Sequence, residues 1–480
     1  MKHIVLIALL LVTQGFLSAC STNQATGRQQ FTALMSPAQE NQIGASEHQK
    51  IAAQFGLYEE PKINAYVSEI GRKVAAHTER SDVEYKFYVI DSPIVNAFAL
   101  PGGYIYMSRG LLALANTEAE VAAVMAHEVG HITGRHSAER YSRSTVTQLG
   151  ANILSIALDS GAAAQALGLG ANLYLSAYSR SQENESDSLG LRYMTRAGYT
   201  PEAMPKFLSS LQASSGLDAK IADRKQEVSY LSTHPATGDR VNKTNAESQR
   251  YPAEGNIGGE RHMRMINGMP FGDSAKQGFA HGQTFYHTEL GFTFEAPQGY
   301  RIVNQPTQVI AAAKDGRAMV FDMASNPGKL DAGTYLKQVW LKGEKVNAVE
   351  PITINGMKAS TAQFSGNVNG KRANIRLVAI EFRPDQFARF QIVIPSGASA
   401  ATVNELKRAS YSFSKLSNRQ RDSLKPHQVK VITARAGDTA ATMAKKMAIT
   451  QYPEDTFRVL NALVPGEALK AGQQYKIVVK

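Results

Sequence analysis

Cysteine is almost absent from this 480-residue chain, in which Cys20 is the only one. A disulfide within the chain is therefore impossible. The sequence is neither highly charged nor poor in apolar residues, since hydrophobic residues make up 43% and charged residues 19%. These values are ordinary for globular protein and argue against both a disordered chain and a polytopic membrane protein. A chain of this length has room for about three domains.

The first twenty residues differ in character from the rest. Lys2 supplies a positive charge, and residues 4–12 form an unbroken apolar run that is too short to span a membrane. Residues 17–20 then have the residue types of a lipoprotein cleavage box. We therefore predict a signal peptide over residues 1–19 and a lipidated tether over 20–35, with the lipid on Cys20. The alternative is an ordinary signal peptide followed by a chance cysteine.

The residue after Cys20 bears on the destination of the chain. Bacterial lipoproteins, which this start resembles, carry more than one acyl chain on the cysteine, and that number is needed for stable anchoring. Ser21, rather than Asp, follows the cysteine. By analogy with enterobacterial sorting, we expect a lipid anchor on the periplasmic side of the outer membrane.

The net charge of +11 is concentrated toward the C-terminus, where residues 405–480 hold 14 Lys and Arg against 6 Asp and Glu. A basic chain can bind nucleic acid, but export argues against that partner. We expect instead that the basic surface of an appended module faces anionic lipid, lipopolysaccharide or cell-wall polymer.

A mainly helical domain with a small sheet is predicted over residues 36–250. Its first helix has a start signature in Ser36, Pro37 and Gln39, a serine cap with a glutamine that can complete a capping box. Alternating apolar residues over 84–107 predict the sheet. Residues 149–178 are rich in Gly and Ala with a single charge, and predict a buried helical hairpin rather than a membrane insertion.

Two smaller domains are predicted to follow. Residues 251–283 lack periodicity and are predicted to be a linker. Residues 284–415 are predicted to form an α+β domain, because short alternating segments are separated by hairpin signals at Asp315-Gly316, Asn355-Gly356 and Asn369-Gly370. A basic linker over 416–426 then precedes a last unit over 427–480.

The residues that carry chemistry begin with His-Glu-Val-Gly-His at 127–131. Thr117 and Glu120 predict a capping box, so a helix starts just before this motif. His127 and His131 lie four residues apart, on one face of that helix, where two imidazoles can hold one metal ion. Glu128 is at the edge of the same face and can reach a metal-bound water. The alternative is a pair of surface histidines.

A third zinc ligand is needed from elsewhere in the chain. Glu183 and Asp187 lie one turn apart in a stretch that is predicted to be helical until Gly198. One of these carboxylates could bind the metal while the other accepts a hydrogen bond from a ligating histidine. Taken alone, the pair could equally be a solvated helix face.

A family resemblance assigns roles to these residues. The segments 127–140, 178–187 and 96–103 resemble the zinc metallopeptidase family of HtpX, the CaaX prenyl proteases, BepA and LoiP. The resemblance covers about residues 25–250 and implies a gluzincin-type domain with one Zn²⁺. It implies His127, His131 and Glu183 as zinc ligands and Glu128 as the catalytic base. Asp187 is implied as a hydrogen-bond partner of a ligand or a proton donor.

The resemblance also singles out a strand and a loop. Asn96, Ala97, Phe98 and Ala99 resemble the edge strand on which such peptidases bind extended substrates, the alternative being an interior strand. His234 matches a loop histidine that can occupy the open zinc position in BepA-like proteins, the alternative being a histidine packed by Pro235. His136 follows His131 by five residues and is therefore turned off the ligand face, so we predict a structural role for it.

The two later domains resemble known modules. Ala436-Gly437-Asp438-Thr439 and the segment 469–477 resemble a LysM module, a small βααβ unit that binds cell-wall glycan, which makes peptidoglycan a candidate partner. Aromatic residues that such modules often carry are missing here. The 284–415 domain resembles PsbP-like folds, and its ligand is unknown.

These observations predict a zinc-dependent endopeptidase of the bacterial cell envelope. Its expected substrates are misfolded or unassembled periplasmic and outer-membrane proteins, cleaved through a water that Glu128 activates on the zinc. One alternative is a cell-wall zinc hydrolase, which a LysM-like module would suit. Another is an assembly or chaperone factor whose protease site is regulated or idle.

Overall fold

The computed structural model describes residues 20–157, 177–222, 230–235, 238–342, 346, 348–368 and 370–480. The predicted signal peptide and residues 158–176 of the predicted hairpin lie outside these ranges. The chain divides into two compact units, one made of Met1–Phe271 with His427–Lys480 and the other of Gly272–Pro426. The last segment of the chain therefore belongs to the same unit as the mainly helical domain.

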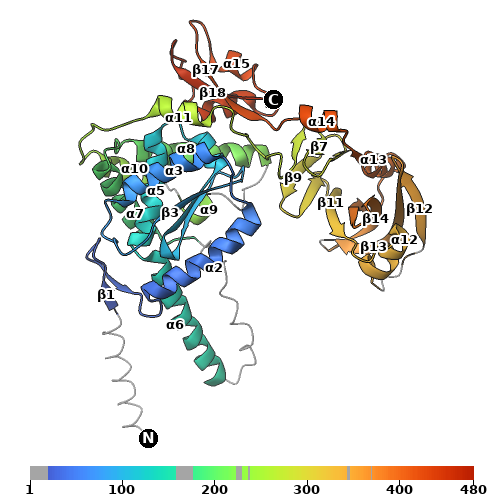
Figure 1. Ribbon diagram of the computed structural model, residues 1–480, viewed down its shortest axis with the longest axis horizontal. Coiled ribbons are helices and arrows are strands. Elements are labelled where there is room, and N and C mark those ends of the chain that lie inside the picture. The colour runs from blue at the N-terminus through green and yellow to red at the C-terminus, as the bar shows by residue number, and fades with distance from the viewer. Residues whose placement is uncertain are drawn as a thin grey trace. The chain divides into compact units, whose positions relative to one another are not determined.

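The first unit is mainly helical (Figure 1). Its helices are, in chain order, α2 (Pro37–Phe55), α3 (Pro61–Ala75), α4 (Arg109–Leu114), α5 (Glu118–Thr133), α6 (His136–Ala157), α7 (Arg180–Arg196), α8 (Ala203–Ala222), α9 (Tyr230–Thr233), α10 (Gly238–Ser248) and α11 (Gly259–Ile266). Every residue of α5 is buried, so this helix is the centre of the core. Among the helices described, none combines the length and apolar character that a membrane crossing requires.

A small three-stranded sheet lies before α5, as the alternation over 84–107 predicts. Its order is β3 (Lys86–Ile90), β5 (Tyr104–Ser108) and β4 (Ala97–Leu100), with β4 at one edge and antiparallel to β5. Pro101, Gly102 and Gly103 make the turn between β4 and β5. Both glycines have positive φ, a conformation that residues with a Cβ rarely adopt.

The segment predicted as a tether is folded against the first unit. β1 (Cys20–Thr22) pairs with β2 (Gln29–Phe31). Between them, the side-chain amide of Asn23 donates to the carbonyl oxygen of Thr133 at 2.9 Å. Arg28 forms ion pairs with Glu139 and Glu185, at 2.9 and 3.0 Å. These long-range partners order a segment whose composition alone predicts little structure.

The segment predicted as a linker, 251–283, also contains regular structure. Helix α11 packs Met263 and Ile266 into the main core. His262 approaches the carbonyl oxygens of Leu112 and Ala115 at 3.2 and 3.0 Å, close to the hydroxyl of Tyr66. The apolar residues of α11 are spaced one helical turn apart, but the many Gly and His residues around them obscure this period in the sequence.

Residues 427–480 form a strand–helix–helix–strand unit, in the order that the sequence predicts. Its elements are β17 (Gln428–Thr433), α15 (Ala440–Ala444), α16 (Pro453–Leu460) and β18 (Gln474–Val479). Backbone hydrogen bonds join it to the residues after α11, with Gly268 donating to Val429 and Val429 donating to Met269. Val429 is part of the main hydrophobic core. The module is thus integrated into the first unit.

The second unit contains two antiparallel sheets, as its hairpin signals predict. The larger has the order β12 (Val349–Ile354), β13 (Met357–Val368), β14 (Lys371–Arg383), β15 (Gln386–Pro395), β11 (Ala318–Ser325), β10 (Gln308–Ala312), β9 (Arg301–Gln305). The smaller has the order β16 (Ser414–Lys415), β8 (Phe292–Glu295), β7 (Thr284–His287), β6 (Phe279–His281). Asn355 and Gly356 both have positive φ in the turn between β12 and β13.

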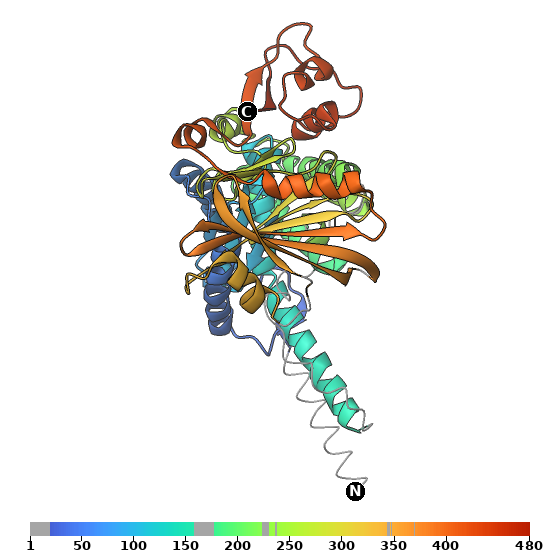
Figure 2. The same ribbon diagram turned by 90° about the vertical axis from the view of Figure 1, so that its right-hand side faces the viewer.

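Helices cover both faces of the larger sheet (Figure 2). Alternate residues of β14 enter two separate cores. One core includes α13 (Ala400–Tyr411), and the other includes α12 (Ala332–Tyr335) with the helical turn Leu336–Trp340. The segment after β16 forms α14 (Asn418–Ser423), within the predicted basic linker.

Candidate metal centre

Four side chains that can bind a metal converge in the first unit. His127 and His131 come from α5, Glu183 from the first turn of α7, and His234 from the residue after α9. One ligand atom from each lies within 4.8 Å of the others, and all four residues are buried. Among the described residues this is the one cluster of its kind. The family resemblance had singled out the same four residues, His127, His131 and Glu183 as zinc ligands and His234 as a loop histidine.

Capping residues fix where the two helices begin. Ser179 and Gln182 form a full capping box at α7, which places Glu183 in its first turn. At α5 the hydroxyl of Thr117 accepts from the Glu120 backbone at 3.1 Å, but the Glu120 carboxylate accepts from Asn116 at 2.7 Å. The predicted capping box is therefore half formed, because Glu120 reaches one residue further back.

Glycine allows the two helices to approach closely. A Cβ on Gly130 would lie 2.9 Å from the backbone oxygen of Ser186, and one on Gly190 would lie 3.1 Å from the backbone nitrogen of His127. Neither contact leaves room for a methyl group without movement of α5 or α7. The hydroxyl of Ser186 also donates to the His127 carbonyl at 2.5 Å. This close packing sets the distance between Glu183 and the two histidines.

The ligand atoms are as close as hydrogen-bond partners. The Nε2 atoms of His127 and His131 are 3.0 Å apart, and Nδ1 of His234 is 3.3 Å from Nε2 of His127. Oε1 of Glu183 lies 2.9 Å from Nδ1 of His234 and 3.4 Å from Nε2 of His131. Nitrogen lone pairs and a carboxylate oxygen thus face one point, and that donor set is the one zinc prefers.

Asp187 lies behind His127 and outside the cluster. Its Oδ1 is 2.8 Å from Nδ1 of His127, which leaves Nε2 of the imidazole facing Glu183. Arg240 donates to both Asp187 oxygens, at 2.6 and 2.7 Å, and its Nη1 is 2.5 Å from Glu183. Although burial alone would raise it, Arg240 holds the pKa of Asp187 below its ordinary value. Asp187 is therefore anionic, and both of its carboxylate oxygens accept hydrogen bonds.

Arg240 is a site residue that the sequence reasoning missed. It is 4% exposed and neutralises two acidic residues beside the cluster. A buried charge of this kind needs partners, and both partners are far away in sequence. The single available signal was its position six residues after His234.

His131 also has a side-chain partner, His136, on the side away from the cluster. Nδ1 of His136 is 2.8 Å from Nδ1 of His131, and Nε2 of His136 is 3.3 Å from Glu185. Burial would raise the pKa of Glu185, but His136 and Arg28 together lower it to about 2. His136 thus lies off the metal cluster, as its spacing predicts, and contacts a ligand from behind.

Glu128 is the residue whose environment most requires an explanation. It is fully buried, and neither carboxylate oxygen has a hydrogen-bond partner among the described residues. Its closest charged neighbour is Nε2 of His234 at 3.6 Å. Burial raises its pKa. A buried carboxylate without partners beside four converging ligand atoms fits a centre that binds a cation and a water molecule.

His234 is held in place by aromatic rings. Its ring stacks on Tyr230 with centroids 4.5 Å apart and lies 5.2 Å from the ring of Tyr178. The Tyr178 backbone donates to the Thr233 carbonyl at 3.1 Å, so the segment before α7 is tied to the turn that carries His234.

Strand β4 lies beside this centre. A small hollow between them is lined by Ala99, Leu100, His131, Ser137 and Tyr178. Ala97 to Leu100 are all buried, and the side-chain oxygen of Asn96, just before the strand, has no partner among the residues described. The strand is therefore at a sheet edge rather than in the interior of the sheet, and it lies near His131.

Part of this chain is similar to known proteins. Residues 61–248 match the model of peptidase family M48. The putative beta-barrel assembly-enhancing protease of Vibrio cholerae is 32% identical over 206 residues, 40% of each chain. The beta-barrel assembly-enhancing protease of Escherichia coli is 30% identical over 217 residues, 43% of each chain.

A eukaryotic protein is also similar. The mitochondrial metalloendopeptidase OMA1 of Schizosaccharomyces pombe is 28% identical over 207 residues, which cover 42% of this chain and 59% of that protein. The chain thus spans 40% and 43% of the length of the two bacterial relatives that it matches.

Proposed function

Because residues 61–248 match the model of peptidase family M48, we propose that this chain is a zinc-dependent endopeptidase. The observation that carries the proposal is the buried cluster of His127, His131 and Glu183 with the unpaired carboxylate of Glu128 beside it. His127, His131 and Glu183 would hold the zinc, one ion per chain. When bound, zinc polarises the scissile carbonyl and makes a water acidic enough to ionise near neutral pH.

The protein side chains supply the rest of the chemistry. Glu128 accepts the proton of the attacking water and passes it to the leaving amine. Asp187 fixes the orientation of His127 rather than acting as a proton donor, because Arg240 engages both of its oxygens. The free edge of β4 binds an extended substrate through main-chain hydrogen bonds.

His234 regulates this site in our proposal. Its ring lies within the ligand cluster, where it would compete with water for a bound zinc. The enzyme with His234 in that position is at rest. Displacement of the His234 ring would free the position without disturbing the other ligands.

The substrates in our proposal are misfolded or unassembled proteins of the outer membrane and periplasm. The names of the bacterial relatives, beta-barrel assembly-enhancing proteases, support this class. A lipid on Cys20 anchors the chain to the periplasmic side of the outer membrane, as the cleavage box before it indicates. The 427–480 module, through its LysM-like sequence, gives access to peptidoglycan.

Zinc-loaded full-length protein, with and without Glu128→Gln, tests the proposal against three substrates: casein, an unfolded outer-membrane barrel and purified peptidoglycan. The same series is measured in the His234→Ala background, because the wild type is at rest in our proposal. We expect proteolysis that Glu128→Gln abolishes, and no release of muropeptides. Equal cleavage with and without Glu128→Gln would refute the assignment of the base. Muropeptide release without proteolysis would favour a cell-wall hydrolase. A lack of activity on every substrate would favour an assembly factor.

A further inference from the structure

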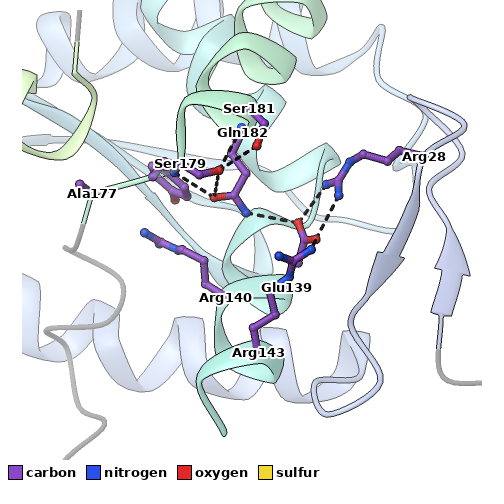
Figure 3. A pocket seen from close by; sticks show the side chains of 9 residues that line it. Arg28, Glu139, Arg140, Arg143, Ala177, Ser179, Ser181 and Gln182 are labelled. Carbon is purple, nitrogen blue, oxygen red and sulfur yellow. Dashed lines mark hydrogen bonds and ion pairs between the residues drawn. The ribbon is translucent and has the colours of Figure 1, made fainter. Parts of the chain in front are cut away.

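A basic hollow lies on the far side of Tyr178 from the metal cluster. It has a volume of about 420 Å³, and its polar lining includes Arg28, Glu139, Arg140, Arg143, Ser179 and Ser181. Figure 3 shows these side chains at the meeting of α6 and the first turn of α7. None of them belongs to the ligand set or to the groups that support it directly.

The charge of this hollow is positive, because its one carboxylate is already neutralised. Both oxygens of Glu139 accept from Arg28, at 3.0 and 2.9 Å, and one of them also accepts from Arg143 at 2.8 Å. Gln182 donates to the same carboxylate at 3.3 Å. Burial would raise the pKa of Glu139, but Arg28 holds it below the ordinary value. Arg28 also pairs with Glu185 at 3.0 Å, just outside the lining, so three arginines face two carboxylates and an excess of one positive charge remains.

A single aromatic ring separates the hollow from the metal centre. The ring of Tyr178 stacks on His131 with centroids 3.7 Å apart, and the guanidinium carbon of Arg140 lies 3.8 Å from the centre of the same ring. Two groups this close cannot share one face of a ring, so His131 and Arg140 lie on opposite faces. Tyr178 also lines the small hollow between β4 and His131.

From this geometry we infer that the hollow is a subsite for a carboxylate of the polypeptide substrate, close to the scissile bond. The inference rests on the proposed peptidase function. A chain bound along β4 passes His131, and a side chain or chain end that extends beyond Tyr178 reaches Arg140 and Arg143. Guanidinium groups and the exposed hydroxyls of Ser179 and Ser181 are donors that suit a carboxylate. The group recognised is an Asp or Glu side chain or the C-terminal carboxylate of the substrate.

Matched peptides distinguish these two sources. One quenched fluorescent series differs only by Glu or Gln at each position within three residues of the cleaved bond, and a second differs only by a free or amidated C-terminus. We expect the zinc-loaded full chain to prefer the carboxylate member of one series by about tenfold in kcat/KM, and the same series in the His234→Ala background is used if the wild type is silent. A preference in the first series identifies an acidic side chain, and one in the second identifies the chain end.

Arg143→Gln and Arg140→Gln should lose that preference while still cleaving the neutral peptide. The matched control is Arg180→Gln, an exposed arginine in the first turn of α7 that does not line the hollow. Arg143 has a side chain that is 68% exposed, so its variant should fold even if Arg140→Gln does not. A preference that survives in Arg143→Gln and in any folded Arg140→Gln would overturn the inference.

Binding to the Glu128→Gln protein, measured by fluorescence anisotropy, separates failure of the subsite from failure of the peptidase. If no peptide is cleaved but the carboxylate peptide binds about tenfold tighter than its neutral match, the subsite stands and the proposed activity fails. If the protein cleaves both members equally, the subsite is refuted and the peptidase stands. If it cleaves neither and binds both equally, the subsite and the proposed activity both fail.

Discussion

The ammonium group of Lys476 donates a hydrogen bond of 2.7 Å to the carbonyl oxygen of Ala115, 361 residues earlier in the chain. It also donates to Ala113 and Leu114, at 2.7 and 3.0 Å. These are the last carbonyls of α4, where a positive charge is stabilised by the helix dipole. Thr117, the cap of α5, follows two residues later. The C-terminal module therefore holds the start of the helix that carries His127 and His131.

Lys476→Met should loosen this module. Three buried carbonyl groups lose their donor, but burial also lowers the pKa of Lys476 to about 7, so relief of desolvation offsets part of the loss. We expect a net loss of about 1–3 kcal/mol. Hydrogen exchange of residues 266–271 and 427–433 should rise about tenfold or more. Lys430→Met, an exposed lysine in β17, is the control, and identical exchange in the two variants would contradict the role of Lys476.

The second unit should lose stability in acid through His287. Burial lowers the pKa of His287 to about 4 from 6.5, and its Nδ1 accepts a hydrogen bond from the Leu290 backbone at 3.2 Å. Between these two pH values the unfolded chain binds more protons than the folded one. The free energy of unfolding should therefore fall as the pH drops from 6.5 toward 4, by roughly 1–3 kcal/mol.

Trp340, the one tryptophan of the chain, lies in the second unit and reports its unfolding in urea. His287→Asn keeps a side-chain acceptor for Leu290 but does not titrate. The difference in unfolding free energy between wild type and variant should change over this pH window. A difference that stays constant from pH 7 to 4 would exclude His287 as the cause.

Glu183→Ala and Glu128→Gln should separate metal binding from catalysis. Glu183→Ala removes a proposed ligand, and we expect zinc affinity to fall by more than about 100-fold, with activity lost as well. Glu128→Gln should retain one zinc per chain and lose activity. Elemental analysis of the two purified proteins decides between these outcomes, and equal zinc content would rule out Glu183 as a ligand.

His234→Ala should activate the enzyme. An imidazole in the open coordination position excludes the water that Glu128 must activate, so its removal should increase turnover of casein, or self-cleavage, by about tenfold or more. The comparison requires matched zinc content in both proteins. A variant that is slower than wild type would show that His234 contacts substrate or only packs, and would end the gating model.

Cys20→Ser should release the protein from membranes. Cys20 is the only cysteine, so no other thiol can be acylated. Metabolic labelling with palmitate should disappear in this variant and persist in Ser21→Ala. Labelling that remains in Cys20→Ser would refute the anchor.

Short-range patterns predicted part of the cluster. The four-residue spacing of His127 and His131, the helical stretch before Gly198 and the turn at Asn355 each depend on neighbours within a few residues, so the sequence states them directly. His234 needed a family resemblance, because nothing local links it to α5.

Long-range partners could not be predicted from pattern. Lys476 counts toward the basic C-terminal charge that suggested an exposed surface, yet its side chain is fully buried. Arg28 lies in a segment that is polar like a tether, and its role depends on Glu139 and Glu185. The pairing of such charges is decided by tertiary contacts more than 100 residues apart, which no period or cap encodes.

Gly130 and Gly190 have a consequence for the preorganisation of the site. With no side chains between them, α5 and α7 meet at the backbone, and a Cβ on either glycine would press on the other helix. The two helices therefore hold His127, His131 and Glu183 at a fixed spacing before any metal is bound. Little further ordering of these three side chains would then be needed when an ion enters, which favours tight binding.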